Sequence, residues 1–227
     1  MIWDQLEEIQ RFLENKFEDT GTEIQEEGMD QFNRPGWVNR VWTSNAYRRA
    51  HVDVVDARET KKLWMMHVCV FPHLKSDAPI FGFDVIAGQK KITGCFFDFS
   101  PTTDKSHKMI SWFGNTMAKY GYNKTRELPD WAKQIFGRHM VAAGNVSEES
   151  EMEMITKMIH EGAEYYLKNV ASFNASYVYD TLGKEAQNRY AYYQKQNPHT
   201  PRTMTSLGLG EDDVKLFIHK CLFPEVL

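Results

Sequence analysis

The chain has 227 residues, of which 42% are hydrophobic and 26% are charged, with a formal net charge of −4. This is the balance of an ordinary globular protein, and its mild acidity excludes an overall basic field that would attract nucleic acid or an anionic membrane. The three cysteines are scattered and form no CxxC pair, so they cannot supply an iron–sulfur cluster or an all-cysteine zinc site. Such sparse cysteines indicate an intracellular, reduced protein.

The N-terminal segment 1–17 has the pattern of an amphipathic helix and lacks the basic and apolar regions of a secretory signal. Apolar residues recur there every three or four positions, and acidic residues separate them. The longest apolar run, Leu63 to Phe71, is much shorter than the roughly 20 residues that span a membrane, and His67 interrupts it. We therefore expect a cytoplasmic monomer without a membrane helix, folded as a single domain over 1–227.

The region 37–99 has the composition of a β-sheet. It follows an acidic segment at 19–35, which predicts a loop with room for a short strand. β-Branched and aromatic residues dominate 37–99 and predict four or five strands. Both faces of the run Leu63 to Phe71 are apolar, which indicates a central strand. Short connections to the strands at 80–86 and 92–99 favour antiparallel neighbours.

Helical periodicity replaces the strand pattern after Pro101. The clearest helix is predicted from Glu148 to Asn169, with Ser147 as its N-cap. Two further helices are predicted at 184–196 and 212–223, separated by a proline-containing turn at 197–201. The order of one helix, a block of strands and a block of helices predicts an α+β fold with helices on the sheet faces.

Two polar residues stand out because they interrupt apolar strands: His67 in the third strand and Asp84 in the next. An unpaired polar group in a core costs about 1–3 kcal/mol, so the simplest arrangement is a hydrogen bond between the two across adjacent strands. One interpretation is a structural pair in the core, which is the more common case. The other is a proton donor poised near neutral pH, because burial raises the pKa of a carboxyl group.

The other candidate sites have weaker signals. His51 and Asp53 share one face of a strand and could bind a metal, but no third ligand has a recognisable spacing. Neither Ser111 nor Cys95 lies in a nucleophile motif, which disfavours a hydrolase. The chain contains no GxGxxG and no GxxxxGK[ST] sequence, which disfavours a tightly held dinucleotide or nucleoside triphosphate. We therefore expect no metal in the site.

Several longer motifs resemble those of the ferredoxin-dependent bilin reductases, most closely the phycocyanobilin:ferredoxin oxidoreductase branch. They are HVCVFPHLKSDAPIFGFDVIAG, FFDFSP, ELPDWAKQIFGRH and GNVSEES. The resemblance implies a three-layer α/β/α sandwich with a central antiparallel sheet, in which biliverdin IXα binds between the sheet and the C-terminal helices. It also implies that no cofactor is tightly bound: reduced [2Fe-2S] ferredoxin supplies single electrons and the enzyme supplies protons.

The resemblance further implies roles for three residues of the strands. Asp84 would be the central proton donor, and His67 its partner near the A ring of the bilin. Asp53 stands where the phycocyanobilin-forming relatives carry a glutamate that serves the D-ring vinyl group. The shorter side chain withdraws its carboxyl group by about an ångström, which weakens a proton transfer that depends on geometry. We therefore expect a four-electron reduction through radical steps, with phycoerythrobilin favoured over phycocyanobilin.

Four further residues are expected to contact the substrate. His51 lies beside Asp53, and His199 replaces an aspartate of the relatives, where it would either donate a proton or cap the pocket. Arg202 or Arg138 would neutralise a propionate of the bilin. Ferredoxin would dock on a basic run of lysines, for which the candidates are Lys90, Lys91, Lys105 and Lys108.

A non-catalytic bilin carrier on the same fold is the alternative to an enzyme. A covalent carrier needs an exposed cysteine near the pigment, and the strand positions of Cys69 and Cys95 do not favour one.

Overall fold

The computed structural model describes residues 2–122 and 124–227. Its centre is a seven-stranded sheet in which each strand pairs antiparallel with the next one in the chain. The strands are β1 (Thr22–Ile24), β2 (Trp37–Thr43), β3 (Arg49–Ala57), β4 (Leu63–Phe71), β5 (Ile80–Gly88), β6 (Ile92–Ser100) and β7 (Val141–Ala143). The prediction of up to five strands over 37–99 is confirmed, with β4 at the centre of the sheet.

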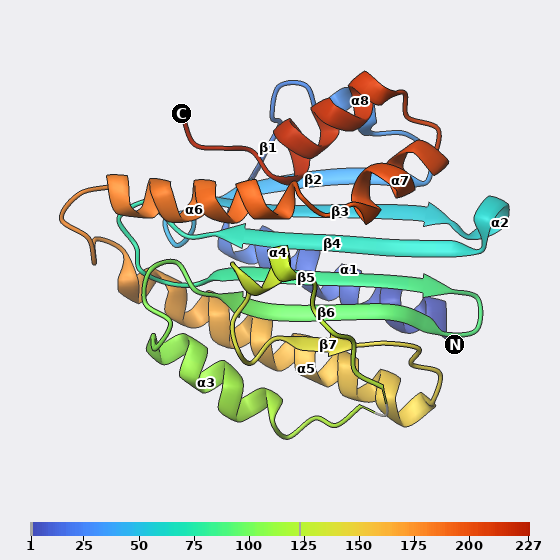
Figure 1. The fold of residues 1–227 in the computed structure, drawn as a ribbon, viewed down its shortest axis with the longest axis horizontal. Helices are drawn as coiled ribbons and strands as arrows, with labels where there is room; N and C mark the ends of the chain where they lie inside the picture. The colour runs from blue at the N-terminus through green and yellow to red at the C-terminus, as the bar shows by residue number, and fades with distance from the viewer. Residues whose placement is uncertain (1, 123) are drawn as a thin grey trace.

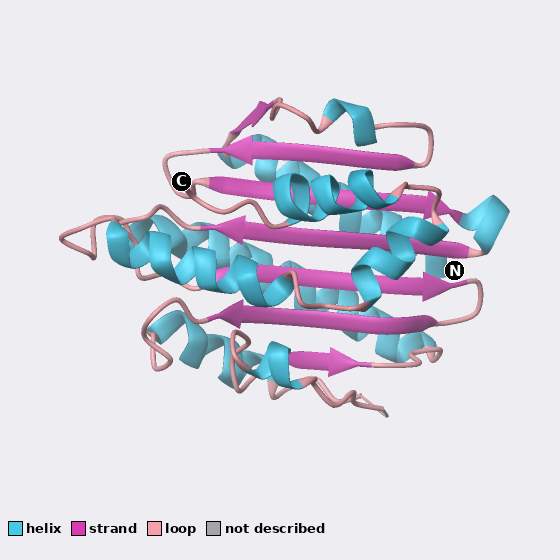
Figure 2. Ribbon diagram, turned by 45° about the horizontal axis from the view of Figure 1, so that its top comes forward, coloured by secondary structure: helices cyan, strands magenta, loops and turns pink. Residues whose placement is uncertain are grey.

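Helices cover both faces of this sheet, as Figures 1 and 2 show. One face carries α1 (Ile2–Thr20), α3 (Lys108–Met117) and α5 (Glu149–Asn169). The other carries α4 (Asp130–Lys133), α6 (Thr181–Gln194), α7 (His199–Ser206) and α8 (Glu211–Leu216). The short elements are η1 (Asp30–Phe32), α2 (Arg58–Lys61), η2 (Val170–Phe173) and the π-helical η3 (Phe217–Leu222). The predicted α+β three-layer sandwich is confirmed.

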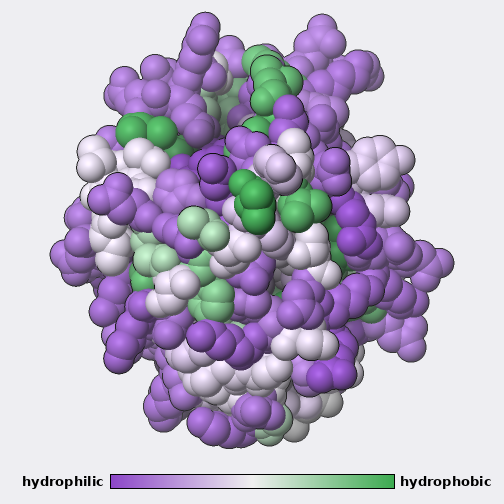
Figure 3. All heavy atoms as spheres, turned by 90° about the vertical axis from the view of Figure 1, so that its left-hand side faces the viewer, coloured by the Kyte–Doolittle hydropathy of each residue, from purple (hydrophilic) through white to green (hydrophobic). Residues whose placement is uncertain are grey.

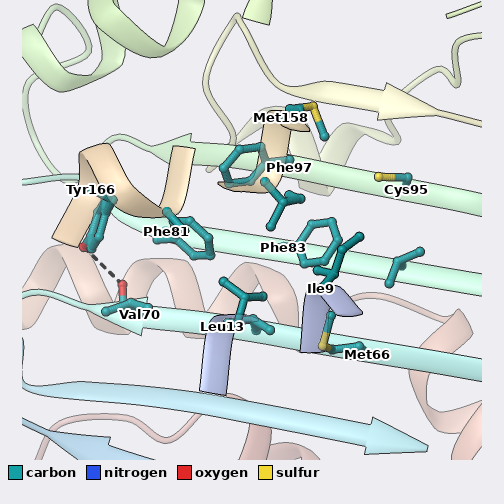
Figure 4. Packing of buried hydrophobic residues seen from close by; sticks show 14 of the residues in the cluster. Ile9, Leu13, Met66, Val70, Phe81, Phe83, Cys95, Phe97, Met158 and Tyr166 are labelled. Atoms are coloured by element: carbon teal, nitrogen blue, oxygen red, sulfur yellow. Dashed lines mark hydrogen bonds between the residues drawn. The ribbon is translucent and has the colours of Figure 1, made fainter. Parts of the chain in front are cut away.

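The layer between the sheet and helices α1, α3 and α5 is an apolar core. Ile9 and Leu13 of α1 pack toward Met66 of β4 and Phe83 of β5, as Figure 4 shows. Figure 4 shows the Tyr166 hydroxyl of α5 directed at the carbonyl oxygen of Val70, which lies 3.4 Å away. The same hydroxyl donates a hydrogen bond of 2.8 Å to the carbonyl oxygen of Pro79. Each buried aliphatic or aromatic side chain of this layer contributes about 1.5–3 kcal/mol. The packing of this layer therefore stabilises the sheet.

The layer on the opposite face is different, because polar side chains are buried in it. The strands of this face contribute a group of buried polar residues, namely Asn39, Arg49, His51, Asp53, His67 and Asp98. Apolar side chains of α6, α7, α8 and η3 cover them. Burial of so many polar groups costs stability unless each one is satisfied or used, so this face is where a functional site is expected.

Three local predictions are wrong. Ser147 does not cap α5, because the helix begins at Glu149 and the extended residue Glu148 precedes it as N-cap. The turn predicted at 197–201 is in part the first turn of α7, where Pro201 is tolerated since its missing N–H has no partner there. Strand β7 was not predicted, because only three residues pair with β6.

The surface carries few apolar groups. Figure 3 shows one end of the molecule as mainly hydrophilic, with small separated hydrophobic areas. Within 2–122 and 124–227, no helix is both long and apolar enough to cross a membrane. Cys69, Cys95 and Cys221 are buried as free thiols.

Candidate active site

A single row of side chains crosses the middle of the polar face. Asn39 of β2 pairs with Asp53 of β3, which pairs with His67 of β4. His67 pairs in turn with Asp84 of β5, and Asp84 with Phe96 of β6. Directly opposed residues of antiparallel strands have their side chains on the same face, about 4.5–5.5 Å apart. The register of the sheet thus brings Asp53, His67 and Asp84 together, although they lie far apart in the sequence.

A cavity of about 120 Å³ lies above this row. Asp53, His67 and Asp84 form part of its floor, together with Met65 and Phe96. Its roof comes from the C-terminal helices and the segment after η3, through Gln194, His199, Thr203, Met204, Leu222 and Phe223. The cavity therefore lies between an ionisable sheet surface and a layer of C-terminal helices.

Asp84 is poised to act as an acid. Its side chain is half-buried and faces the cavity, and it forms no hydrogen bond with another described residue. Desolvation by burial raises its pKa to about 7, because the charged carboxylate has lost its water. Near neutral pH, a large fraction of Asp84 therefore carries a proton that a bound molecule can take.

His67 is a neutral neighbour and not a hydrogen-bond partner of Asp84. Burial and then the positive charge of Arg49 lower its pKa to about 4. Its ring stands edge-on to Phe223, with the ring centres 5.3 Å apart, and its buried Nδ1 has no partner among the described residues. The predicted direct bond between His67 and Asp84 is wrong, because the two side chains rise side by side from opposed strand positions.

Asp53 is a second protonated carboxyl group on the other side of His67. Burial raises its pKa to about 7, the hydrogen bond from Trp37 opposes this shift, and the charge of Asp84 adds to it. The Trp37 indole N–H donates a bond of 2.7 Å to Asp53 Oδ1. The row thus holds two acids of similar strength on either side of a neutral imidazole, and Trp37 fixes one of them in place.

His51 lies behind this row, in the second layer of the same face. Its Nε2 lies 3.0 Å from Asn39 Oδ1, and burial, Arg49 and His67 lower its pKa well below the usual value. Arg49 forms an ion pair with Glu26. It also donates a hydrogen bond of 2.8 Å to the carbonyl oxygen of Cys221. His51 does not line the cavity, so its predicted contact with substrate is indirect in this structure.

The remaining predicted residues lie at or beyond the rim. His199 lines the cavity as the first residue of α7 and is exposed. Arg202 is exposed on the same helix and does not line the cavity. Arg138 lines two other hollows, on the far side of β6 and β7. No group of three histidine, cysteine or acidic side chains among the described residues could hold a metal ion.

The sequence reading missed Asp98, a buried aspartate of β6. Its Oδ2 accepts hydrogen bonds from Ser100 Oγ at 2.7 Å and from the backbone N–H of Gly137 at 2.8 Å. Burial raises its pKa to about 7. The signal was the one that identified Asp84, a lone acid within an apolar strand, but Asp98 lies near the strand end, where polar residues are ordinary.

Comparison with known proteins identifies the family of this chain. The family model described as ferredoxin-dependent bilin reductase matches residues 5–224, nearly the whole chain. The chain belongs to the ferredoxin-dependent bilin reductase family. As a bilin reductase, it is an oxidoreductase that acts on bilins with electrons from ferredoxin, and the resemblance found in the sequence is confirmed.

Several relatives agree with this family. The bilin reductase is 27% identical over 192 residues to phycocyanobilin:ferredoxin oxidoreductase of Prochlorococcus marinus, covering 82% of this chain and 74% of the relative. It is 25% identical over 190 residues to the protein of that name from Synechococcus elongatus, with the same coverage of both. The solved structure of PcyX is 35% identical with a TM-score of 0.75, covering 98% of this chain and 99% of that chain.

Phytochromobilin synthase from tomato, solved in complex with biliverdin, also has a TM-score of 0.75, over 96% of this chain and 82% of that chain. At 13% identity this likeness concerns the fold alone. The bilin reductase thus combines a fold shared by distant bilin enzymes with its own row of two acids and one histidine.

Proposed function

We propose that this bilin reductase carries out the four-electron reduction of biliverdin IXα to phycoerythrobilin, with reduced [2Fe-2S] ferredoxin as donor. The observation that carries this proposal is the row of Asp53, His67 and Asp84 at the floor of a cavity. Two carboxyl groups with pKa values of about 7 supply protons at the pH at which ferredoxin supplies electrons. We further infer a cytoplasmic monomer.

In this mechanism, the bound tetrapyrrole takes up a first proton from the protein, and single electrons from ferredoxin and further protons then enter it in turn. Asp84 donates the first proton, because its carboxyl group is protonated and opens into the cavity. A protonated bilin accepts an electron more readily, and protonation also quenches the radical that each electron leaves. Four electrons and four protons complete the reduction of two double bonds. His67 orients the A-ring side and stays neutral because its pKa is about 4.

Asp53 supports phycoerythrobilin as the product over phycocyanobilin. Its short side chain is tied to Trp37 by a bond of 2.7 Å, which restrains it from reaching out of the sheet. A glutamate at this position would carry its carboxyl group further into the cavity and serve the exovinyl group of the D ring. The alternative product, phycocyanobilin, requires that Asp53 protonates that group despite its restraint.

The bilin must open the cavity to bind. Pockets for molecules of this size occupy about 300–1,000 Å³, whereas the cavity in this structure has about 120 Å³. Helix α7 and the segment at Phe223 form its roof, so they move outward when the pigment enters. His199 and Arg202 of α7 would then lie near a propionate. Arg138 would reach a propionate from the segment before β7, and His51 would hold the sheet surface behind the pigment.

The cysteines weigh against the alternative of a covalent bilin carrier. Burial raises the pKa of Cys69 and of Cys221 to about 12 and raises that of Cys95 as well. A thiol that stays protonated is a poor nucleophile toward a vinyl group. A carrier would also have no use for two acids with raised pKa values facing the same cavity.

An anaerobic reaction of the purified enzyme with biliverdin IXα and reduced ferredoxin tests this proposal. Absorption spectra follow the reaction, and chromatography identifies the extracted pigment. We expect conversion to phycoerythrobilin. Phycocyanobilin as the sole product would contradict the role given to Asp53, and binding without conversion would establish a carrier.

A further inference from the structure

Asp98 has one carboxyl oxygen that is buried and unused. Its Oδ2 is saturated by Ser100 and Gly137, while Oδ1 has no hydrogen-bond partner among the described residues. Only 1% of the residue is exposed. An orphaned oxygen of this kind costs free energy in a purely structural role, which suggests that Oδ1 exchanges a hydrogen bond during function.

The Tyr190 hydroxyl of α6 lies above Gly82 of β5, a neighbour of both Asp98 and Asp84. Asp98 pairs across the sheet with Gly82, and Asp84 follows Gly82 on the same strand face. A methyl group placed on Gly82 would lie 3.2 Å from the Tyr190 oxygen, so the hydroxyl sits directly above this glycine. The α-carbon of Gly82, below this hydroxyl, is one strand spacing, about 4.8 Å, from the α-carbon of Asp98. It is about 7 Å along the strand from the α-carbon of Asp84.

The hydrogen of the Tyr190 hydroxyl is directed at an acceptor other than Gln194. Tyr190 Oη accepts a bond of 2.7 Å from Gln194 Nε2, so its own O–H must point elsewhere. Cys69 shares a side-chain hydrogen bond with Tyr190, and Asp84 and Asp98 also act on the pKa of Tyr190. Because the Cys69 thiol keeps its own proton at a pKa of about 12, the two carboxyl groups are the neighbours with which Tyr190 can exchange one. Gln194 also lines the cavity above Asp84.

A second hollow lies beside Gly137, whose backbone N–H donates a hydrogen bond to Asp98. It has a volume of about 440 Å³, and Pro101, Ser106, Phe136, Gly137 and Arg138 are among its lining residues. Asp98 Oδ1 lies 3.1 Å from the position of a methyl group on Gly137, so only the bare glycine backbone stands between Asp98 and this hollow. The positive side chains at its mouth are Lys105, Lys133 and Arg138.

We propose that Asp98 is a positioning residue for proton supply, which refills Asp84 through the Tyr190 hydroxyl with protons that enter by the hollow beside Gly137. This inference rests on the proposed function, because a bilin reduction consumes four protons and each one that Asp84 donates must be replaced. In each refill, Tyr190 gives its proton to the Asp84 carboxylate and takes one from the Asp98 carboxyl. Asp98 then takes a proton from water in the hollow, with single waters bridging any gap beyond direct reach.

The raised pKa of Asp98, about 7, suits this exchange. The groups that face the relay are Tyr190 from α6, Cys69 from β4 and Asp84 from β5, with Arg138 at the entrance. Tyr190 keeps its own proton at rest, since burial raises its pKa well above the usual value. The relay therefore moves a proton without leaving a stable charge on the tyrosine.

The test compares Asp98→Asn and Tyr190→Phe with the wild type in stopped-flow reduction of biliverdin IXα by reduced ferredoxin. Both variants should bind the pigment and complete the first protonation, because Asp84 already holds that proton. The later protonation steps should slow at least tenfold, and the double variant should be no slower than the slower single variant, since both act on one path. Tyr166→Phe, the same change on the opposite face of the sheet, is the matched control and should keep the wild-type rate.

Chemical rescue separates a relay from a merely structural role. Asp98→Ala leaves space for a small carboxylic acid, so formate added to this variant should restore the later steps, whereas formate should not rescue Tyr190→Phe. Unchanged rates in both single variants, or a first step slowed as much as the later ones, would overturn the relay alone. A wild type that fails to reduce biliverdin would overturn the proposed function, and the relay with it.

Discussion

At the scale of single residues, burial converts ordinary aspartates into acids that work near neutral pH. Asp53, Asp84 and Asp98 each have a pKa of about 7, and burial is the largest cause in each case. The sequence identified Asp84 and His67 because they interrupt apolar runs. It could not identify their relation correctly, since the ring orientation of His67 depends on Phe223, which lies far along the chain.

The glutamate variant at Asp53 tests the basis of product choice. Asp53→Glu adds one methylene and releases the carboxyl group from its bond to Trp37, so we expect more phycocyanobilin among the products. Chromatography of the extracted pigments measures the ratio. Asp53→Asn keeps the length and serves as the control, which should not shift products toward phycocyanobilin. An unchanged ratio in the glutamate variant would remove this explanation of product choice.

The raised pKa of Asp53 also predicts a pH-dependent cost in stability. Folded Asp53 keeps its proton up to a pH of about 7, whereas the unfolded residue loses it near pH 4. The folded state binds more protons in this window, so the contribution of Asp53 to stability falls as the pH rises through it, by at most about 1.4 kcal/mol per pH unit.

Asp53→Asn should therefore gain stability relative to the wild type between about pH 4 and pH 7, and the difference should be constant above that window. Denaturant unfolding at a series of pH values measures it. His51 and His67 have lowered pKa values, so their contribution to stability rises with pH. This contribution is the same in both proteins and cancels when the free energy of unfolding of the wild type is subtracted from that of the variant. The control is Asp130→Asn on the exposed start of α4, and a difference independent of pH would contradict the raised pKa.

At the scale of elements, the positions of the helices on the sheet depend on close packing, which the sequence could only partly predict. The amphipathic patterns predicted most of α1 and all of α5, because apolar periodicity records which face is buried. They did not predict α7, since a segment with two prolines is typical of a turn and becomes helical only where it covers the cavity. The short strand β7 depends in the same way on its pairing with β6.

Gly183 tests how α6 is seated. A methyl group on this glycine would lie 1.8 Å from the carbonyl oxygen of Leu74, in the loop between β4 and β5. Gly183→Ala should therefore push α6 from the sheet and destabilise the fold by about 1–3 kcal/mol or more. Thermal unfolding measures the effect. Gly121→Ala, where a methyl group would meet nothing within 4 Å, should leave the midpoint unchanged, and equal midpoints for both variants would contradict this packing.

At the scale of the whole molecule, one face of the sheet forms the apolar core and the other carries the candidate active site. The face under α1, α3 and α5 is apolar and closely packed, as Figure 4 shows. The face under α6, α7 and α8 buries the polar row and a cavity too small for a tetrapyrrole. Composition and order of elements predicted the layers, but the size of the cavity depends on side chains of the central strands and of the C-terminal helices, which lie far apart in the sequence.

This division predicts where biliverdin changes the dynamics. Amides of α7 and of the segment around Phe223 should exchange hydrogen faster than those of α5 in the free enzyme, because the roof must open. Biliverdin should slow exchange in the roof and leave α5 unchanged, as measured by hydrogen exchange and mass spectrometry. Protection spread equally over both faces would contradict an opening confined to the roof.

The central claim is that Asp84 donates the proton that makes ferredoxin-driven reduction of the bilin possible. The most direct measurement is a single anaerobic turnover of biliverdin IXα with reduced ferredoxin, by the wild type and by Asp84→Asn. We predict that the variant binds the pigment yet reduces it about 100-fold or more slowly, the usual contribution of a positioned acid. Reduction by Asp84→Asn at the wild-type rate would contradict the claim.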